Sequence, residues 1–351
     1  MAGLRVLQAI GGGGRGGAEL QFTRLAIALA RAGLNQLLLV RRDAERTATL
    51  RQGGVEPVEL PFGGPFDLAT RLAFRRELAR FDPAVVLTWM NRATAFCPHP
   101  RGRRFVHLAR LGGYYELRYY RRCDHLIANT ADIAEYIRRG GWPADRVHVL
   151  PNFVAAETTA PVPRQSFGTP AGVPLLLALG RLHLNKAFDV LLEAMARVPE
   201  AWLWLAGSGK LEGSLKQQAE RLGIADRVRF LGWRDDLPAL AAAADMIVVP
   251  SRHEPLGNVV LEAWAQRRPV VAAASQGPSA LIRNEESGLL VPVEDAAALA
   301  GAIRRVIAEP GLAARLVGGG WAAFQADYTE AKSVARYLKL FERLAGAARA
   351  G

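Results

Sequence analysis

The chain of 351 residues contains little cysteine, only five lysines and no long apolar run. Its two cysteines, Cys97 and Cys123, have neither a CxxC spacing nor a Cys/His partner, which excludes a disulfide framework and a zinc site of the usual pattern. No stretch approaches the roughly 18 apolar residues of a membrane span. The first residues also lack a basic region followed by a long apolar core and a cleavage site. We therefore expect a cytoplasmic protein, with no metal ion and no other cofactor.

Lysine is absent from residues 1–165, whereas arginine is abundant there. This part has 24 arginines against 14 acidic residues, a formal charge of +10, while residues 166–351 have 21 basic and 19 acidic residues, a charge of +2. Codon bias in a GC-rich genome would favour arginine over lysine, but it would not concentrate the charge in one half. The asymmetry predicts an anionic partner, such as membrane lipid head groups, a phosphorylated glycan or nucleic acid.

Nucleic acid is the least favoured of these partners, because no aromatic side chains interleave with the basic ones and no nucleic-acid-binding module is recognisable. We expect instead a peripheral protein at the inner face of the cytoplasmic membrane, where each basic residue near the surface contributes about 1 kcal/mol. A merely solvated charged face is the alternative. The basic residues form two groups, Arg71, Arg75, Arg76 and Arg80 at helical spacing, and Arg101, Arg103, Arg104, Arg118, Arg121 and Arg122.

Short apolar runs alternate with amphipathic stretches twice along the chain, which is typical of βαβ units with a parallel sheet. In the first half we predict strands at 4–10, 36–40, 55–60, 84–88, 105–108, 124–128 and 147–150 and helices at 19–32, 67–80 and 130–140. In the second half we predict strands at 175–179, 202–206, 228–231, 246–249, 270–273 and 289–291 and helices at 188–198, 211–222, 237–243, 257–267 and 295–308.

A segment rich in proline and small residues, 155–174, separates the two halves and is predicted to be a linker. The fold class is therefore α/β, with two Rossmann-like domains facing a central cleft. We assign residues 1–160 to an N-terminal domain and 161–328 to a C-terminal domain. Residues 329–351 are expected to form a last helix; a solvent-exposed or dimerising helix is the alternative to one that packs on the N-terminal domain.

The segment PSRHEPLGNVVLEAWAQRRPVVA, residues 250–272, has the strongest local pattern. Pro255 disfavours a helical conformation at Glu254, so a loop is expected between a strand and a helix that opens at Gly257. Two carboxylates then bracket the start of this helix, Glu254 in the loop and Glu262 further along the helix.

The start of this helix is predicted to bind phosphate, because its first backbone N–H groups have no partner inside the helix. The flanking carboxylates suit a sugar nucleotide, since they accept hydrogen bonds from ribose and hexose hydroxyls. A helix start whose glutamates only complement the helix dipole is the alternative. The residues whose N–H groups would bind the anion are Gly257, Asn258 and Val259.

A second pattern is LALGRLHLNKAFDVLLEA, residues 177–194, in which Arg181 and Lys186 follow a buried strand. Both cations are expected at the carboxyl edge of the sheet. Fixed there, they would stabilise the negative charge that develops on a departing diphosphate. Two solvated surface cations are the alternative.

A third pattern is the glycine run at residues 11–17, which leads into a helix. So many glycines match the GxGxxG spacing in several registers, and the match is therefore weak. Glycines nevertheless let the backbone approach a ligand closely, and Gly16 and Gly17 stand at a helix N-terminus. A mobile loop is the alternative in the absence of ligand.

Taken together, these motifs resemble family 4 of the retaining glycosyltransferases, which have the GT-B architecture. The matching segments cover almost the whole chain in the family's order. They are GGAE at 16–19, CDHLIANTADIAEYI at 123–137, VLPNF at 149–153, GRL to FDVLLEA at 180–194, LAGSG at 205–209, FLGWRDDLPALAAAADMIVVPSRHEPLGNVVLEAWA at 230–265, GP at 277–278 and GLLVP at 288–292.

The resemblance implies roles for the residues that match. The E-x7-E motif falls on Glu254, near the donor sugar, and Glu262, which binds the ribose. Arg181 and Lys186 hold the diphosphate, and the GGAE glycines approach the donor phosphate or the acceptor. The resemblance also implies a hexosyltransferase that retains the anomeric configuration and needs no metal. It implies an acceptor-binding N-terminal domain (1–160), a nucleotide-sugar-binding C-terminal domain (161–328) and a last helix that crosses back onto the N-terminal domain.

The sequence departs from the family pattern at two positions. Ala187 stands where the family usually has glycine, and Leu256, counted among the donor-binding residues, stands where an aromatic is common. Both bear on the identity of the donor. The family often has a histidine on the acceptor side, which corresponds here to His107 after Phe105-Val106; a buried structural histidine is the alternative.

The expected reaction is a front-face displacement, in which the acceptor hydroxyl attacks the anomeric carbon from the side on which the nucleoside diphosphate leaves. The acceptor would be a glycan or a lipid-linked glycan of a lipopolysaccharide core, a capsule or a similar cell-surface polymer. A sugar-nucleotide epimerase or a phosphorylase could share the two-domain plan, and a basic nucleic-acid-binding protein would share the charge. An NAD dehydrogenase is disfavoured, because no clear GxGxxG is followed by an acidic residue in the right context.

Overall fold

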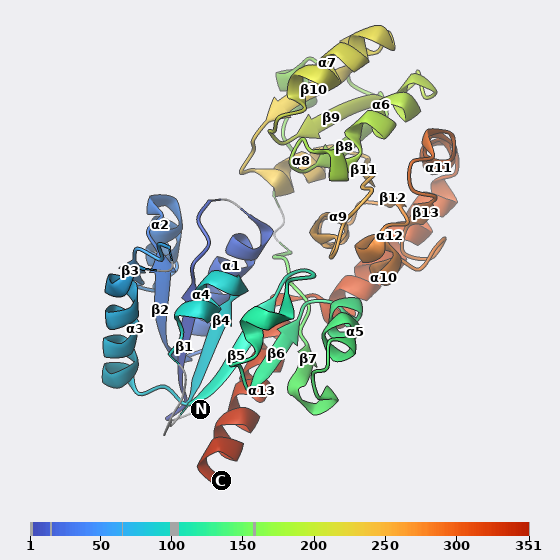
Figure 1. The fold of residues 1–351 in the computed structure, drawn as a ribbon. Helices are drawn as coiled ribbons and strands as arrows, with labels where there is room; N and C mark the ends of the chain where they lie inside the picture. The colour runs from blue at the N-terminus through green and yellow to red at the C-terminus, as the bar shows by residue number, and fades with distance from the viewer. Residues whose placement is uncertain (1–2, 15, 65, 99–104, 157–158, 351) are drawn as a thin grey trace. The chain divides into compact units, whose positions relative to one another are not determined.

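The computed structural model describes residues 3–14, 16–64, 66–98, 105–156 and 159–350. The chain forms two compact units, which we call the N-terminal unit (Met1–Phe153 with Glu330–Gly351) and the C-terminal unit (Val154–Thr329). Each unit has one parallel sheet with helices on both faces (Figure 1). These features confirm the predicted α/β class with two Rossmann-like domains. The division after Phe153 lies seven residues before the predicted boundary.

The N-terminal sheet has the strand order β3-β2-β1-β4-β5-β6-β7. Its strands are β1 (Arg5–Ile10), β2 (Asn35–Arg41), β3 (Val58–Leu60), β4 (Val85–Trp89), β5 (Val106–Leu111), β6 (His125–Ala128) and β7 (Val147–Val149). Its helices are α1 (Gly17–Arg31), α2 (Ala44–Gln52), α3 (Leu68–Phe81), α4 (Met90–Phe96), α5 (Ala131–Arg139) and α13 (Glu330–Ala350).

The C-terminal sheet has the order β10-β9-β8-β11-β12-β13. Its strands are β8 (Leu175–Leu179), β9 (Trp202–Ala206), β10 (Val228–Gly232), β11 (Met246–Val249), β12 (Val270–Ala273) and β13 (Leu289–Val291). Its helices are α6 (Phe188–Ala196), α7 (Glu212–Arg221), α8 (Leu237–Ala243), α9 (Asn258–Ala265), α10 (Gln276–Leu281), α11 (Ala296–Ala308) and α12 (Pro310–Asp327).

Three helix starts in the N-terminal unit follow from polar side chains at the capping position. Asp43, Asp67 and Thr130 each accept a hydrogen bond from the N–H three residues on, at the starts of α2, α3 and α5. Thr130, the first residue of the helix predicted at 130–140, is thus the residue that caps α5, and this helix is confirmed. The sequence analysis missed α2, α4 and α10, which are too short for an apolar stripe of helical period to stand out. It also missed α12, whose buried residues recur every four positions but whose middle contains three glycines, Gly318–Gly320, which disfavour a helix.

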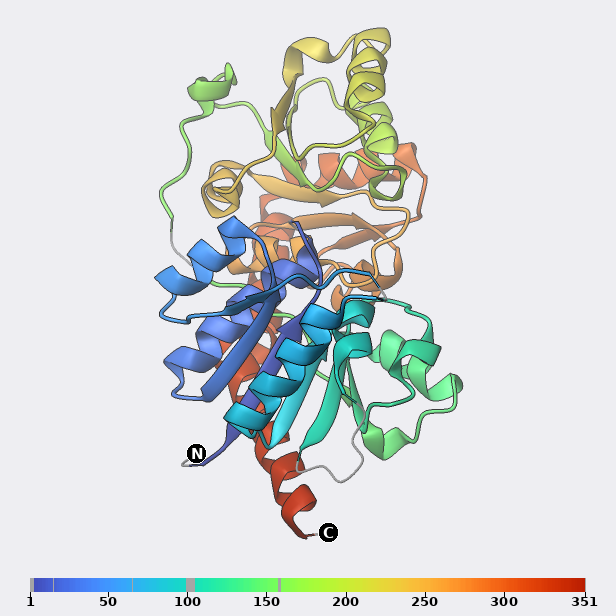
Figure 2. The same cartoon turned by 60° about the vertical axis from the view of Figure 1, so that its left-hand side comes forward.

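The two faces of the N-terminal sheet bury different helices. Successive strand residues point to opposite faces, so Val6 and Ile10 pack with α1 and α13, while Leu7 and Ala9 pack with α3 and α4. The last helix, α13, inserts several apolar side chains into the N-terminal core and lies behind the sheet in Figure 2. These side chains are Val334, Tyr337, Leu340, Phe341 and Leu344.

The segment 155–174 was predicted to be a linker, and this prediction is wrong for its second part. The N–H of Val162 bonds to α8, and the guanidinium of Arg164 donates to the carbonyl of the last residue of α8 at 2.9 Å. The ring of Phe167 packs edge-on against Trp204 with centroids 5.0 Å apart. The segment contains no α-helix or strand among its described residues, only a 3₁₀ turn at Arg164–Phe167, yet it packs on the C-terminal unit.

Across the described residues, every helix is too short or too polar to cross a membrane.

Candidate active site

Each sheet has one point where the strand order reverses, beside β1 and β4 in the N-terminal unit and beside β8 and β11 in the C-terminal unit. Ligands of open α/β sheets bind beyond the carboxyl ends of the strands at such a point. The loop after β8 contains Arg181 and Lys186, and the loop after β11 contains Glu254. Because β8 and β11 pair directly, the fold brings the two loops with the predicted donor-binding residues to one edge.

The loop after β8 positions Lys186 through unusual backbone conformations. Gly180 has φ +145°, and a Cβ at this position would lie 3.0 Å from Cε of Lys186, so the lysine side chain lies across the glycine. Ala187, the next residue, has a left-handed φ of +52°. The family's usual glycine would adopt this conformation freely, whereas alanine is strained there by about 1–2 kcal/mol.

The ammonium group of Lys186 forms an ion pair with Oε2 of Glu254, and the two side chains are only 22% and 13% exposed. The other carboxylate oxygen of Glu254 accepts a hydrogen bond from the N–H of Gly257 at 3.3 Å. Gly257 is the N-cap of α9 and has φ +83°, a conformation that favours glycine. One carboxylate therefore connects a cation to a helix start, which corrects the prediction of a helix start with three free N–H groups.

Arg252 holds the two loops together, and the sequence analysis did not identify it. Its guanidinium binds both carboxylate oxygens of Asp189 on α6 at 2.8 and 2.6 Å, donates to the carbonyl of Leu184 at 2.9 Å and pairs with Glu294. Burial by itself would raise the pKa of Asp189, but the hydrogen bonds from Arg252 hold this pKa below its ordinary value. A bidentate pair between two loops fixes their spacing.

Glycines permit the close crossing of the loops at this edge. A Cβ at Gly207 would collide with the main chain of Gly180, and one at Gly209 with the main chain of Leu182. At Gly277 a Cβ would collide with the main chain of the Glu254 loop, and its N–H donates to the carbonyl of Glu254 at 2.7 Å. The LAGSG and GP motifs therefore support the geometry of the Lys186–Glu254 pair.

The other predicted donor-binding residues of the C-terminal unit lie on the same two loops and on α9. Arg181 is exposed and makes no ion pair with any residue the structure describes. Leu256 is buried beneath the loop, and Asn258 and Val259 form the first turn of α9. Glu262 is partly buried on the next turn of α9. The described residues include no group of three or more His, Cys, Asp or Glu side chains placed to hold a metal ion.

The glycine loop after β1 is held in place by two residues that the sequence analysis missed. Arg46, which is buried on α2, donates to the carbonyl of Gly12 at 3.0 Å and to that of Gly14 at 3.2 Å. Asp43 accepts a hydrogen bond from the N–H of Gly14 at 3.2 Å. α1 then begins at Gly17. These bonds argue against a freely mobile loop.

Replacing Arg46 by methionine is expected to lower the free energy of unfolding by about 1–3 kcal/mol, because two carbonyl groups lose their donor. The amides of residues 12–17 should also exchange hydrogen faster. Hydrogen exchange and chemical denaturation measure the two effects. Arg51→Ala is the matched control, since its pair with Glu56 is exposed and its loss should leave the midpoint unchanged. Equal exchange in Arg46→Met and wild type would contradict the role of Arg46.

Further polar groups gather at the same edge of the N-terminal sheet. The Glu19 carboxylate of α1 lies against Gly12 and Gly16, because a Cβ at either glycine would collide with it. Burial and the nearby Glu19 carboxylate raise the pKa of Tyr115. Asn129, directly after β6, is buried, and its Oδ1 has no hydrogen-bond partner among the described residues. A buried acceptor without a donor is unusual and is open to a ligand hydroxyl.

His107 lies elsewhere. It is the second residue of β5, at the amino end of the strand, because β5 continues to Leu111 and does not end at residue 108 as predicted. The imidazole is buried, and its Nε2 is 3.0 Å from the hydroxyl of Thr88. The prediction that His107 faces an acceptor at the carboxyl edge is therefore wrong, and the structural alternative holds.

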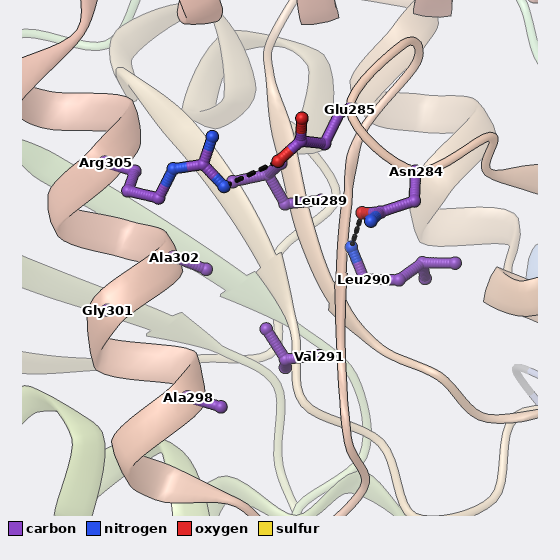
Figure 3. A pocket seen from close by; sticks show the side chains of 9 residues that line it. All are labelled: Asn284, Glu285, Leu289, Leu290, Val291, Ala298, Gly301, Ala302 and Arg305. Atoms are coloured by element: carbon purple, nitrogen blue, oxygen red, sulfur yellow. Dashed lines mark hydrogen bonds and ion pairs between the residues drawn. The ribbon is translucent and has the colours of Figure 1, made fainter.

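A hollow of about 270 Å³ lies between β13 and α11 in the C-terminal unit (Figure 3). Its floor is apolar, and its polar side chains already bind one another or the backbone: Glu285 pairs with Arg305 at 2.7 Å, and Asn284 accepts the N–H of Leu290 at 2.8 Å. None of the predicted site residues lines it. The hollow is therefore no candidate for the active site.

Sequence comparison places the chain among known proteins. Residues 15–158 match the family described as Glycosyltransferase Family 4, and residues 173–309 match the family Glycosyl transferases group 1. The chain is 36% identical to the lipopolysaccharide core biosynthesis glycosyltransferase LpsE of Rhizobium meliloti (strain 1021) over 332 residues, 93% of this chain and 95% of LpsE. It is also 36% identical to LpsD of the same organism, over 94% of this chain and 96% of LpsD.

The fold is shared with solved glycosyltransferases. The crystal structure of Anabaena HepE in complex with UDP and glucose has a TM-score of 0.83 at 22% identity and covers 97% of this chain and all of that one. The Thermosynechococcus elongatus sucrose-phosphate synthase has a TM-score of 0.79 at 24% identity over 98% of this chain and all of that one. Because relatives well above 30% identical span nearly the whole sequence, the chain belongs to the glycosyl transferases group 1, of the family 4 type, and is a glycosyltransferase.

Proposed function

We propose that the protein is a retaining glycosyltransferase that moves a sugar from a nucleoside-diphosphate sugar to a glycan or lipid-linked acceptor of the lipopolysaccharide core. The names of LpsE and LpsD support the pathway, and the similarity to each extends over almost both full lengths. The observation that carries the donor part is the Lys186–Glu254 ion pair at the reversal point of the C-terminal sheet.

In this proposal the C-terminal unit holds the donor. The diphosphate takes the ammonium of Lys186 as its counter-ion and also meets the exposed guanidinium of Arg181. Glu254, released from Lys186, accepts hydrogen bonds from the sugar hydroxyls while it stays bonded to Gly257. Glu262 binds the ribose hydroxyls from the second turn of α9. The ion pair thus keeps both groups in position until a substrate exchanges with it.

The reaction is a front-face displacement. The acceptor oxygen forms a bond to the anomeric carbon while the bond from that carbon to the diphosphate oxygen breaks on the same face. The acceptor proton passes to the departing phosphate oxygen. The cations stabilise the charge that develops on the leaving group, and we propose that they do so without a metal ion.

The acceptor is assigned to the N-terminal unit. Glu19 and Asn129 offer acceptors for sugar hydroxyls at the carboxyl edge of its sheet. The formal charge of +10 on residues 1–165 suits an acceptor that sits in an anionic membrane. We therefore place the enzyme peripherally at the inner face of the cytoplasmic membrane, without a nucleic-acid partner.

A thermal-shift panel of UDP-, GDP- and ADP-sugars tests the donor part. A true donor at 100 times its dissociation constant should stabilise the protein by about 2.7 kcal/mol, and EDTA should leave this shift unchanged. The anomer first released during donor hydrolysis, followed by NMR, tests retention. An inverted product would overturn the mechanism, and the absence of any shift across the panel would overturn the donor class.

A further inference from the structure

Three large apolar side chains are exposed together at the start of α3. Phe66, directly before the N-cap, is 94% exposed, and Leu68 and Leu72 are 68% and 64% exposed. Leu68 and Leu72 are four residues apart on one helix and therefore lie on the same face, one turn from each other. We call Phe66, Leu68 and Leu72 the α3 apolar patch. At these positions a surface helix of a water-facing protein would have polar residues.

The patch is displayed by a well-anchored helix start. Asp67, the N-cap, accepts hydrogen bonds from the hydroxyl of Thr70 at 2.5 Å, from the N–H of Thr70 at 2.9 Å and from that of Gly63 at 2.7 Å, and these bonds lower its pKa. Thr70 and Phe74 are buried on the opposite face of α3. The helix thus already buries one apolar face against the sheet, and the patch is a second apolar surface that the N-terminal unit leaves in water.

Arginines surround the patch. Arg71, Arg75 and Arg76 lie three or four residues beyond Leu68 or Leu72, so each lies one turn from a leucine. Arg76 shares the carboxylate of Glu77 with Arg80, and within the described residues Arg75 has no ion-pair partner. Exposed apolar side chains beside exposed arginines are typical of surfaces that enter the head-group region of anionic lipids.

The patch is also connected to the candidate acceptor edge. Helix α3 follows β3, so its start lies at the carboxyl edge of the N-terminal sheet (Figure 1). The guanidinium of Arg92 donates to the carbonyl of Phe62 in the loop that leads to Phe66, at 3.2 Å. The side chain of Arg92 in turn packs on Gly11, since a Cβ there would lie 2.9 Å from its Cγ. Arg92 thus links the loop that leads to Phe66 with the glycine loop after β1.

We propose that the α3 apolar patch, flanked by Arg71, Arg75 and Arg76, is the surface by which the protein binds an anionic lipid bilayer. The apolar side chains enter the acyl boundary and the arginines pair with lipid phosphates, which turns the acceptor edge of the N-terminal unit toward the membrane. This inference rests on the proposed membrane-borne acceptor, and it assigns that contact to one helix instead of to the charge of the whole N-terminal half.

Vesicle binding tests the proposal with the full chain. Phe66→Ser combined with Leu72→Ser should weaken binding to vesicles of phosphatidylglycerol and phosphatidylethanolamine about tenfold or more, because the buried apolar area is lost. Arg75→Glu should weaken it too and reduce its dependence on salt. The matched controls lie in the C-terminal unit, Trp233→Ser for an exposed apolar side chain and Arg221→Glu for an exposed arginine. They should bind as wild type does.

A probe at residue 66 tests insertion directly. Both native cysteines are buried, so Phe66→Cys accepts an environment-sensitive fluorophore selectively. Its emission should shift to the blue on anionic vesicles and stay unchanged on phosphatidylcholine, while the same label on Trp233→Cys should not respond. Donor hydrolysis by the patch variants should equal that of wild type, which shows that they are folded.

If the patch variants bind anionic vesicles as tightly as wild type does, the inference about α3 is overturned, while the proposed membrane association stays intact. A wild-type protein that ignores anionic vesicles but is stabilised by a donor would overturn the membrane contact and spare the transferase. Self-association of wild type that Phe66→Ser with Leu72→Ser abolishes, without vesicle binding, would show that a second copy covers the patch and would overturn the inference as well.

Discussion

The variant Lys186→Ala is expected to transfer sugar, or to hydrolyse its donor, about 10²- to 10³-fold more slowly than wild type, the usual loss when one fixed charge-stabilising group is removed. The ammonium of Lys186 is fixed across Gly180 and is the cation paired with Glu254. Without it the developing charge on the diphosphate loses its counter-ion. The carboxylate of Glu254, only 13% exposed, would also lack its ion-pair partner and repel the donor.

Glu254→Gln separates these two effects, because glutamine keeps the shape and removes the charge. We expect a loss of turnover there too. The substitution should weaken binding of the nucleotide sugar more than binding of the nucleoside diphosphate alone. Lys216→Ala is the matched control, since Lys216 forms an exposed pair with Glu212 on α7. Steady-state kinetics and the thermal midpoint of each variant are the measurements. Near-normal turnover in both Lys186→Ala and Glu254→Gln would defeat the assignment.

The second large effect concerns the last helix. Phe341→Ala is expected to lower the free energy of unfolding of the N-terminal unit by about 3–5 kcal/mol, because the ring is fully buried between α13 and the sheet. Chemical denaturation measures the change in the free energy of unfolding. Hydrogen exchange of the β4 and β5 amides shows whether the change acts on the N-terminal unit. Lys339→Ala, on the exposed side of the same helix, should leave it unchanged.

A buried polar contact also joins this helix to the N-terminal sheet. The buried guanidinium of Arg110 donates to the hydroxyl of Tyr337 at 2.8 Å, binds the side chain of Asn152 and lies over the ring of Trp89. Tyr337→Phe should therefore also destabilise the N-terminal unit, by about 1–3 kcal/mol, since a buried charge loses an acceptor. Unchanged exchange of the β4 and β5 amides in Phe341→Ala would show that α13 does not stabilise this unit.

Most of the fold could be predicted because its signals are local. Buried parallel strands are continuous apolar runs, and strands 175–179, 202–206, 246–249, 270–273 and 289–291 were predicted with the bounds that the structure has. The errors have physical reasons. The short helices α2 and α4 lack a long apolar stripe, and the segment after Val162 packs through an arginine and a phenylalanine that no local pattern marks.

The sequence identified most residues of the candidate site, but it did not show where they lie in the fold or which residues they bind. Arg181, Lys186 and Glu254 stand out because charged residues follow buried strands. His107 was misplaced because the end of β5 was set three residues too early, which put a buried side chain at the edge of the sheet. Arg46 gave no signal, since a lone arginine in a basic half of the chain looks like any solvated cation until its partners are known. Arg252 follows the same strand as Glu254, but the sequence does not show that its partner is Asp189, 63 positions away.

The sequence by itself determined the two α/β units, the transferase family, the uneven charge and the residues from which a donor site can be built, because each of these depends on residue type and spacing along the chain. Only the tertiary structure decided that Lys186 pairs with Glu254, 68 positions away, that Arg46 holds a glycine loop 34 positions before it, and that α13 completes the N-terminal core. The order of the strands and the close crossing of their loops set these distances, and a linear pattern contains neither.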